Sequence, residues 1–338
     1  MSQLSDRIRR DFAAGDKIRD AHFTTPDDVV RYDDISYGPD EKYHLLDVYR
    51  PVNKPAHQSV LGTAGGAVPV SAKLPVIMIV HGGAWVYGNK EVYQYYGMSL
   101  AQRGFAVVNF SYRLAPESKF PAQLEDICTV FDWIYDNRDK YGLDADNVFA
   151  VGDSAGAHLL GLFAAVRSNP DYVRELKEKY PGVRITLPAG QGECVDSYRG
   201  ACLRAVALNC GKYDLTKDDE ADKDTPLLLA DFLKEGGSSK ELGLTCVTDW
   251  VTKDYPPVFM MTCPGDFLKY QAPFMEQALR DNSVPFVYRF YGDAGNPLHH
   301  VFHCNAGLES AKICNDDECD FFRKHKSGDV TGDSFLQR

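Results

Sequence analysis

The segment from Val148 to Leu159 reads VFAVGDSAGAHL. Its first four residues are apolar and suit a buried strand, and the small apolar residues that follow Ser154 suit a packed helix. Between them, residues 152–156 form the pattern G-x-S-x-G. In this strand–turn–helix context the pattern predicts a nucleophile elbow. Ser154 would then stand at a helix N-terminus, where N–H groups and the helix dipole favour developing negative charge.

The two glycines of this pattern, Gly152 and Gly156, have a steric reason. The predicted turn is so tight that a side chain on either flank would strike the neighbouring strand or helix. The competing interpretation is a structural glycine turn in which Ser154 has no chemical role.

Short apolar runs and longer helical patterns alternate along the chain, which is typical of a parallel sheet wrapped by helices. Two earlier, more polar runs, 30–37 and 43–49, are expected to form an antiparallel edge pair. The predicted core strands are 76–80, 105–110, 148–152, 203–209, 258–262 and 284–290, and the predicted helices are 91–103, 119–140, 154–167, 270–281 and 306–325.

The net charge and the apolar runs of the chain limit the classes of partner that it can bind. Its 338 residues carry a net charge of −11, from 48 acidic and 37 basic residues, so the average surface field repels nucleic acid and anionic lipid. The start lacks the apolar stretch of a signal peptide, and no run is long enough to span a membrane. We therefore expect a cytoplasmic protein with a small-molecule substrate and with neither nucleic acid nor membrane as a partner, while both a monomer and a homodimer stay open.

The nine cysteines are odd in number and scattered, often within apolar runs. This pattern fits reduced thiols better than a disulfide framework. Cys314 and Cys319 lie five positions apart without a second pair at metal-ligand spacing, so no zinc site is expected.

The run that ends at Val80 leads directly into His81-Gly82-Gly83-Ala84-Trp85. Paired glycines let a backbone approach a substrate with its N–H groups facing inward, as an oxyanion hole requires. The predicted oxyanion hole comprises Gly82, Gly83, Ala84 and Ala155, and the N–H groups of the last three are the expected donors. His81 is expected to brace the loop, whereas Trp85 and Asp153 are candidate substrate contacts, with a core position as the alternative for Trp85.

Three stretches together resemble the hormone-sensitive-lipase-like esterases, often called family IV bacterial esterases, of the α/β-hydrolase superfamily. They are HGGAW at 81–85, SYRLAPE at 111–117 with FPAQLED at 120–126, and GDSAGAHL at 152–159. The resemblance covers roughly residues 30–325. It implies a single α/β-hydrolase domain with an eight-stranded, mostly parallel sheet, no cofactor, and a cap built from the N-terminus and the segment after the sixth strand.

Two polar segments without a place in the core, approximately 1–25 and 211–255, lie where that cap should be. We expect a surface loop from Pro55 to Lys73 and a loose tail over 327–338. The resemblance also assigns Arg113 and Glu117 a structural role, as partners that fix their loop.

The chain departs from the family at Ala84 and Ala157, where glycine is usual. The methyl group of Ala84 keeps the N–H donor but takes room beside the alcohol half of an ester. Poor tolerance of bulky tertiary alcohols follows as a hypothesis.

The triad order of this fold is Ser, acid, His, with each partner on a loop after a strand. Asp266 follows the strand 258–262 and is the preferred acid, with Asp214 and Asp293 as alternatives in more polar surroundings. His300 is the preferred base because His300-Val301-Phe302 matches the family's His-x-Phe ending. His299 and His303 are the competing bases, and His158 is expected to pack beneath the site.

These residues predict a serine carboxylesterase that acts on short acyl or aryl esters of small molecules. An arylformamidase-like amidase is the second reading, because that family resembles the chain at HGGxW and at Ser-Ala-Gly-Ala-His-Leu. The third is a non-catalytic binding protein on a hydrolase scaffold, since fold does not fix function.

Overall fold

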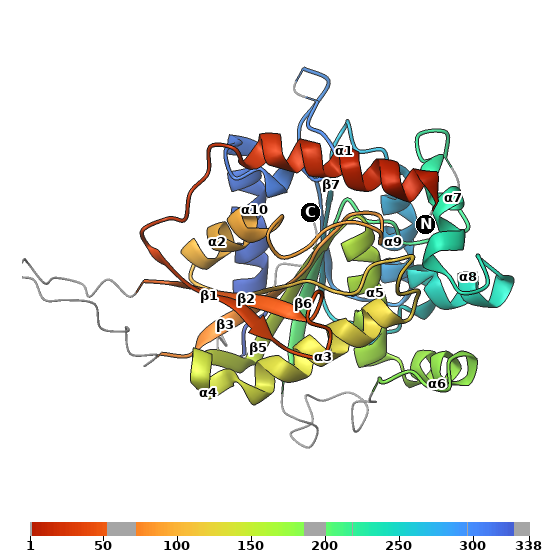
Figure 1. Cartoon of the computed structure of the whole chain (residues 1–338), viewed down its shortest axis with the longest axis horizontal. Coiled ribbons are helices and arrows are strands. Elements are labelled where there is room, and N and C mark those ends of the chain that lie inside the picture. Colours follow the sequence, from red (N-terminus) through yellow and green to blue (C-terminus); the bar gives the residue numbers. More distant parts are fainter. Residues whose placement is uncertain (1, 53–71, 186–200, 218, 296, 328–338) are drawn as a thin grey trace, which may run out of the picture.

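A computed structural model describes residues 2–52, 72–185, 201–217, 219–295 and 297–327 (Figure 1). Most of the predicted loop from Pro55 to Lys73, and all but the first residue of the predicted tail, lie outside the described residues. Among the described residues, no helix has the length and apolar character needed to cross a membrane.

Eight strands form one sheet in the order β1-β2-β4-β3-β5-β6-β7-β8. All neighbours from β4 to β8 pair in parallel, which confirms the predicted α/β-hydrolase sheet. The strands are β1 (Val29–Ser36), β2 (Leu45–Pro51), β3 (Leu74–Val80), β4 (Ala106–Phe110), β5 (Leu143–Asp153), β6 (Leu203–Asn209), β7 (Val258–Thr262) and β8 (Phe286–Phe290).

The first two strands form the predicted antiparallel edge. β1 pairs with β2, and β2 pairs with β4, both antiparallel. The central strands β3 and β4 are buried almost throughout, as expected of strands covered on both faces. The sheet therefore offers the carboxyl ends of its parallel strands as one edge, where loops can carry a site.

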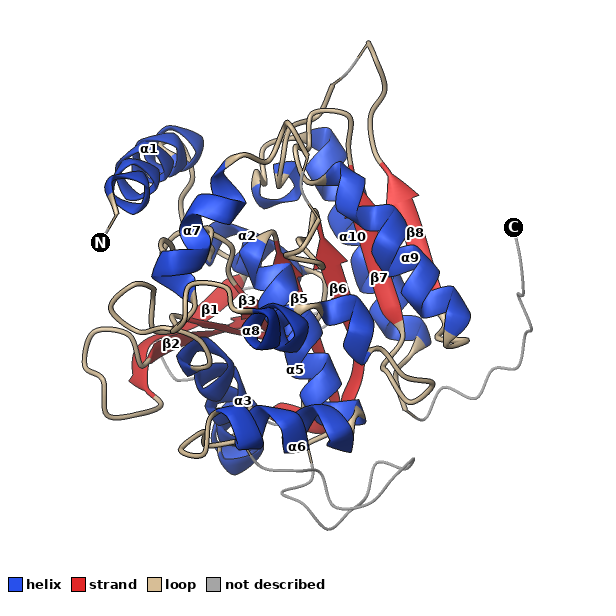
Figure 2. Ribbon diagram, turned by 90° about the vertical axis from the view of Figure 1, so that its right-hand side faces the viewer, coloured by secondary structure: helices blue, strands red, loops and turns tan. Residues whose placement is uncertain are grey.

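Helices cover both faces of the sheet (Figures 1 and 2). Apolar residues of α2 and α10 share one core layer, whereas those of α3, α5, α6 and α9 belong to the other. The helices are α1 (Gln3–Asp20), α2 (Gln94–Gln102), α3 (Ala122–Asp136), α4 (Arg138–Tyr141), α5 (Ala155–Ser168), α6 (Pro170–Lys179), α7 (Asp224–Phe232), α8 (Ser239–Thr245), α9 (Ala272–Asp281) and α10 (Glu309–Lys324), with short 3-10 turns at Val247–Trp250, Lys269–Gln271 and Phe302–Cys304.

Helix α6 was not among the predicted helices. Its start is specified locally, because the side chain of Asn169 accepts hydrogen bonds from the N–H groups of Asp171 and Tyr172, and Pro170 occupies the first turn. The helix is mostly polar and buries only a narrow stripe, so a search for apolar runs passes over it.

The two segments expected to form a cap lie against each other. Figure 2 shows α1 beside α7, and the carboxylate of Asp231 in α7 accepts hydrogen bonds from the N–H of Ser2, at 3.2 Å, and from the hydroxyls of Ser2 and Ser5. The segment 211–255, predicted as a polar stretch around the apolar patch from Pro226 to Phe232, contains both α7 and α8, and that patch lies in α7.

One cysteine departs from the expectation of reduced thiols alone. Cys202 is disulfide-bonded, whereas seven other cysteines are free: Cys128, Cys210, Cys246, Cys263, Cys304, Cys314 and Cys319. Pairing requires two Cα atoms within about 7 Å, a condition set by the fold and not by spacing in the sequence.

Candidate active site

Ser154 occupies a strained turn at the carboxyl edge of the sheet. It links β5 directly to α5 and has φ = 54° and ψ = −120°, a conformation that few non-glycine residues adopt. A Cβ at position 156 would lie 2.1 Å from the carbonyl oxygen of Val80, and one at Gly152 would lie 2.6 Å from that of Gly156. The steric reason for both glycines is therefore confirmed.

Asp266 and His300 are brought together on the loops after β7 and β8. The Nδ1 atom of His300 lies 2.6 Å from Oδ1 of Asp266. The other carboxylate oxygen accepts from the hydroxyl of Thr262, at 2.6 Å, and Oδ1 also accepts from the N–H of Leu268. Burial alone raises the pKa of Asp266, but the hydrogen bond and charge of His300, with these donors, hold it below its ordinary value.

The competing histidines lie elsewhere. His299 is exposed, and His303 is buried, with its ring edge-on to Tyr96. Burial lowers the pKa of His303 to about 3, so this imidazole stays neutral. Of the three candidate histidines, His300 is the one that hydrogen-bonds Asp266.

The competing acids are engaged in local turns. Asp214 accepts hydrogen bonds from the N–H and hydroxyl of Thr216. Asp293 is exposed and accepts from the N–H of Gly295. Asp266 is thus the acidic candidate that the fold places against a histidine.

A pocket of about 330 Å³ opens above Ser154. The ring of Phe267, one of its walls, lies 4.3 Å from that of His300, so the pocket adjoins the acid–base pair. Both expected cap segments reach into it, with Ile8 and Phe12 from α1 and Leu228 from α7.

The loop after β3 has an unusual backbone. Gly83, Ala84 and Trp85 have φ values of 114°, 53° and 62°, three successive positions in the left-handed region. Such conformations cost about 1–3 kcal/mol each for residues other than glycine and persist only where the surroundings hold them. The N–H groups of Gly83, Ala84 and Ala155 donate no hydrogen bond to any described residue.

Gly82 is a correction to the predicted oxyanion hole. Its N–H donates to the hydroxyl of Tyr93 at 2.8 Å, so it is not free for a substrate. That hydroxyl in turn donates to the carboxylate of Asp153 at 2.7 Å. Asp153 is buried, and burial raises its pKa to about 6. Its carboxylate therefore braces the loop through Tyr93, whereas the expected substrate contact of Asp153 stays a prediction.

Trp85 is at once a core residue and a wall of the pocket. Its ring stacks on Phe232 at 4.6 Å, and its indole N–H donates to Nδ1 of His158 at 3.2 Å. Because Nδ1 accepts, the His158 proton must be on Nε2, which donates to the carbonyl of Thr245 at 2.8 Å. Burial lowers the pKa of His158 to about 4, which fits the packing role expected of it.

His81 is fully buried and stacks on Tyr112 with ring centres 3.9 Å apart. Burial lowers the pKa of His81 to about 4, so it is neutral near pH 7. The hydroxyl of Tyr112 donates to the His81 carbonyl at 2.9 Å, which ties the start of the loop to the segment after β4.

The expected pair of Arg113 and Glu117 is wrong. Arg113 binds Asp126 at 2.6 Å and Glu125 at 3.0 Å, both on α3. Glu117 instead pairs with Arg9 of α1 at 2.7 Å. The local sequence offers Arg113 three nearby carboxylates, those of Glu117, Glu125 and Asp126, and only the fold selects the last two.

Within the part of the chain that the structure describes, two clusters combine the donor types that zinc prefers. One is Asp153 with His303 and Cys304, and the other is Cys210 with Asp266 and His300. A metal ion in the second would occupy the imidazole and carboxylate that a serine mechanism needs. Neither cluster was predictable from the sequence, because each brings together segments that lie far apart in the chain.

The family model BD-FAE matches residues 68–268. The chain belongs to the BD-FAE family. Its curated relatives include esterase LipC of Mycobacterium tuberculosis, 33% identical over 43% of this chain and 32% of LipC. Versiconal hemiacetal acetate esterase of Dothistroma septosporum is 28% identical over 71% of this chain and 70% of its own. The alignments thus range from about a third to about seven tenths of the relatives' lengths.

The fold of this BD-FAE family member recurs in solved α/β-hydrolases. Esterase B of Lactobacillus rhamnosis superposes with a TM-score of 0.78 and 22% identity, over 96% of this chain and 95% of that one. At 22% identity the match is evidence of a shared fold alone.

Proposed function

We propose that this BD-FAE family member is a serine carboxylesterase that hydrolyses short-chain acyl, acetyl-like or aryl esters of small molecules. The observation that carries the proposal is the 2.6 Å bond between His300 and Asp266, next to the pocket into which Ser154 opens. Relatives named acetyl esterase and versiconal hemiacetal acetate esterase support the reaction class.

In the proposed mechanism, Nε2 of His300 removes the Ser154 proton as the hydroxyl oxygen attacks the ester carbonyl. The tetrahedral adduct collapses, and the protonated imidazole gives its proton to the leaving alkoxide. A water molecule then repeats the sequence on the acyl-enzyme and releases the acid. Asp266, held by Thr262 and Leu268, fixes the tautomer with its proton on Nδ1 and stabilises the imidazolium.

The oxyanion of that adduct needs donors in the pocket. The free N–H groups of Gly83, Ala84 and Ala155 are the proposed set, since Ala84 and Ala155 both line the pocket with Ser154. Removal of one such donor costs about 10²–10³ in kcat in other enzymes. Gly82 has no part in this set.

A p-nitrophenyl ester series from acetate to decanoate tests the proposal, with Ser154→Ala as the first variant. We expect the highest kcat/KM for short chains and a loss of at least about 10⁴-fold in the variant. A parallel assay on N-formylkynurenine tests the arylformamidase reading. A Ser154→Ala protein as active as the parent would contradict the mechanism.

His300→Gln and His299→Gln form a matched pair of neighbouring substitutions. We expect His300→Gln to lose about 10³-fold or more, because the general base is removed, while His299→Gln retains activity. Equal activity of the two variants would remove His300 from the mechanism.

A further inference from the structure

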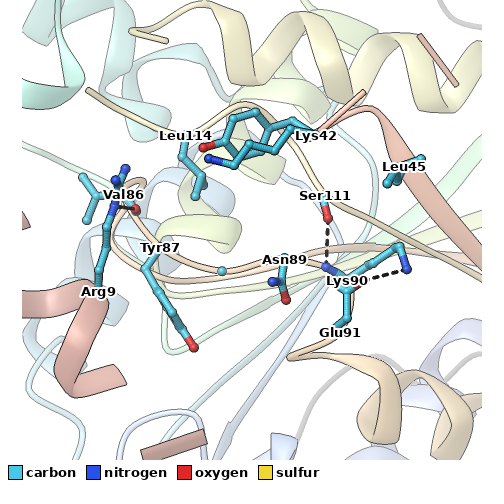
Figure 3. A pocket seen from close by; sticks show the side chains of 12 residues that line it. Arg9, Lys42, Leu45, Val86, Tyr87, Asn89, Lys90, Glu91, Ser111 and Leu114 are labelled. Carbon is cyan, nitrogen blue, oxygen red and sulfur yellow. Dashed lines mark hydrogen bonds and ion pairs between the residues drawn. The ribbon is translucent and has the colours of Figure 1, made fainter. Parts of the chain in front are cut away.

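Arg9 of α1 makes contacts that converge on the oxyanion loop. Its Nε donates to the carbonyl of Val86 at 2.7 Å, and its Nη2 donates to that of Ala115 at 2.8 Å. Both Nη atoms also bind Glu117, at 2.7 and 2.8 Å. Figure 3 shows Arg9 beside Val86, where both line a pocket of about 340 Å³.

The two carbonyls that Arg9 binds are tied to the strained backbone. Val86 directly follows Ala84 and Trp85, whose φ values are positive. The N–H of Ala115 donates to the carbonyl of Trp85 at 3.0 Å, so a fixed Ala115 also fixes Trp85. A single guanidinium therefore holds the loop directly and through its neighbour.

Three further residues on this face of α1 contact the chain just after the oxyanion loop, at Tyr87 and Val92. The ring of Phe12 packs edge-on against Tyr87 at 5.8 Å, and Asp16 accepts a hydrogen bond from the Tyr87 hydroxyl at 2.8 Å. Arg19 donates to the carbonyl of Val92 at 2.6 Å. Residues 9, 12, 16 and 19 are three or four apart and so share one face.

We propose that Arg9 is a positioning residue of the oxyanion hole. Through Arg9, helix α1 holds the left-handed backbone that aims the N–H groups of Gly83 and Ala84 at the pocket. Without this support the strained φ values can relax, which would rotate the donors away from the developing oxyanion. The inference rests on the proposed esterase function, since it concerns the same site.

Arg9→Ala and Arg9→Lys test the role with a short-chain p-nitrophenyl ester. For Arg9→Ala we expect kcat to fall about 10- to 100-fold, less than the loss of a whole donor, while KM changes less than about threefold. Lysine lacks the planar fork and cannot bind both carbonyls and Glu117 together, so it should recover only part of kcat. Arg10→Ala is the matched control, because Arg10 is exposed on the same helix.

Glu117→Gln separates loop positioning from simple anchorage of α1. This change removes the ion pair with Arg9 but leaves the bonds to Val86 and Ala115 available. We expect Glu117→Gln to keep kcat within about threefold of the parent. If it lost as much kcat as Arg9→Ala, the ion pair would carry the effect and the inference would be overturned.

A trifluoromethyl ketone forms a tetrahedral adduct on the serine. Its inhibition constant would not change if Arg9 served only to anchor α1. Its inhibition constant should rise in Arg9→Ala by the same factor as kcat/KM falls, while binding of the product acid stays unchanged. Ethylguanidinium, which fits the space left by the side chain, should restore part of the lost kcat in Arg9→Ala and none in the parent.

The outcomes also separate the two proposals. An inactive parent whose Ser154 is not labelled by a fluorophosphonate would reject the esterase function itself. An active parent with Arg9→Ala as active as Arg10→Ala would reject only the role of Arg9. Should Arg9→Ala fail to fold, Arg9→Lys and Glu117→Gln still decide, because the inference requires the lysine variant to be the slower of the two.

Discussion

The nucleophile elbow and the oxyanion loop both contain residues with φ near +55°, yet they are held in different ways. The elbow lies between two long elements, β5 and α5, and its glycines allow the chain to pass within van der Waals contact of itself and of β3. The oxyanion loop does not lead directly into a helix, since α2 begins only at Gln94. Its supports come from Arg9, Ala115, His158 and Phe232, far apart in the sequence.

This difference shows that a strained turn can be specified in two ways. Where strand and helix enclose the turn, five residues suffice to encode it. Where no helix follows the loop directly, side chains distant in the sequence must hold its backbone in the strained conformation. Four pairs of variants, each a test with its control, measure how the two turns are held.

Gly156→Ala adds a methyl group where the elbow passes closest to β3. We expect the largest effect from this variant. The new methyl group would meet the Val80 carbonyl at 2.1 Å, so the free energy of unfolding should fall by more than about 3 kcal/mol and activity should vanish. Urea denaturation measures the change. Gly15→Ala in α1 is the control, with open space around it, and should gain about 0.5–1 kcal/mol. Similar stability of both variants would contradict the steric argument.

Glu318→Gln tests the long-range support of the elbow. The buried Glu318 carboxylate accepts from Nδ2 of Asn209 at 2.7 Å, and the Asn209 carbonyl accepts from the N–H of Ser154 at 3.0 Å. Burial raises the pKa of Glu318 from 4.5 to about 7. Because the folded state keeps this proton to higher pH, the associated stability is complete below pH 4.5 and is lost as pH rises through 7.

The loss amounts to about 3 kcal/mol for a shift of this size. Urea midpoints between pH 5 and 8 should therefore fall with pH more steeply in the parent than in Glu318→Gln. Glu309→Gln, an exposed change on the same helix, should follow the parent. Parallel curves for all three proteins would show that Glu318 ionises freely in the folded state.

Trp85→Phe tests the support of the oxyanion loop. The ring stack on Phe232 can persist, but Nδ1 of buried His158 loses its donor, which should cost about 1–2 kcal/mol. Trp250→Phe removes an indole N–H bond to the Gly243 carbonyl, at 2.8 Å, away from the loop. We expect similar losses of stability but a several-fold lower kcat only for Trp85→Phe. An equal kcat in both variants would separate the indole bond from catalysis.

Ala84→Gly should have the smallest effect. Removing the methyl group beside the alcohol half of the ester should raise hydrolysis of tert-butyl acetate relative to p-nitrophenyl acetate about threefold or more, with a stability change of a few tenths of a kcal/mol at this positive φ. Ala157→Gly, buried within α5, should cost about 1 kcal/mol and leave the ratio unchanged. Rapid tert-butyl ester hydrolysis by the parent would refute the hypothesis.

Most of the sheet and the elbow were predictable because their signals are local. Apolar runs marked β3 to β8, and G-x-S-x-G with its flanks marked Ser154. The choice of Asp266 followed from triad order, and that of His300 from the family's His-x-Phe ending. The partners of Gly82, Glu117 and Arg9 were not predictable, because each depends on how the chain folds back on itself, over 11 residues for Gly82 and Tyr93 and over 108 for Arg9 and Glu117. Helix α6 was not predicted for another reason, namely that its apolar stripe is narrow.

The two uses of helix α1 have a practical consequence for directed evolution. Ile8 and Phe12 line the pocket beside Ser154, while Arg9 binds the carbonyl of Val86 and Asp16 the hydroxyl of Tyr87, all within two turns and a half of one helix. A library that randomises this helix to change selectivity would therefore mix altered recognition with impaired turnover. Randomising Ile8 and Leu228 with Arg9 and Asp16 kept constant would let a screen score the two properties separately.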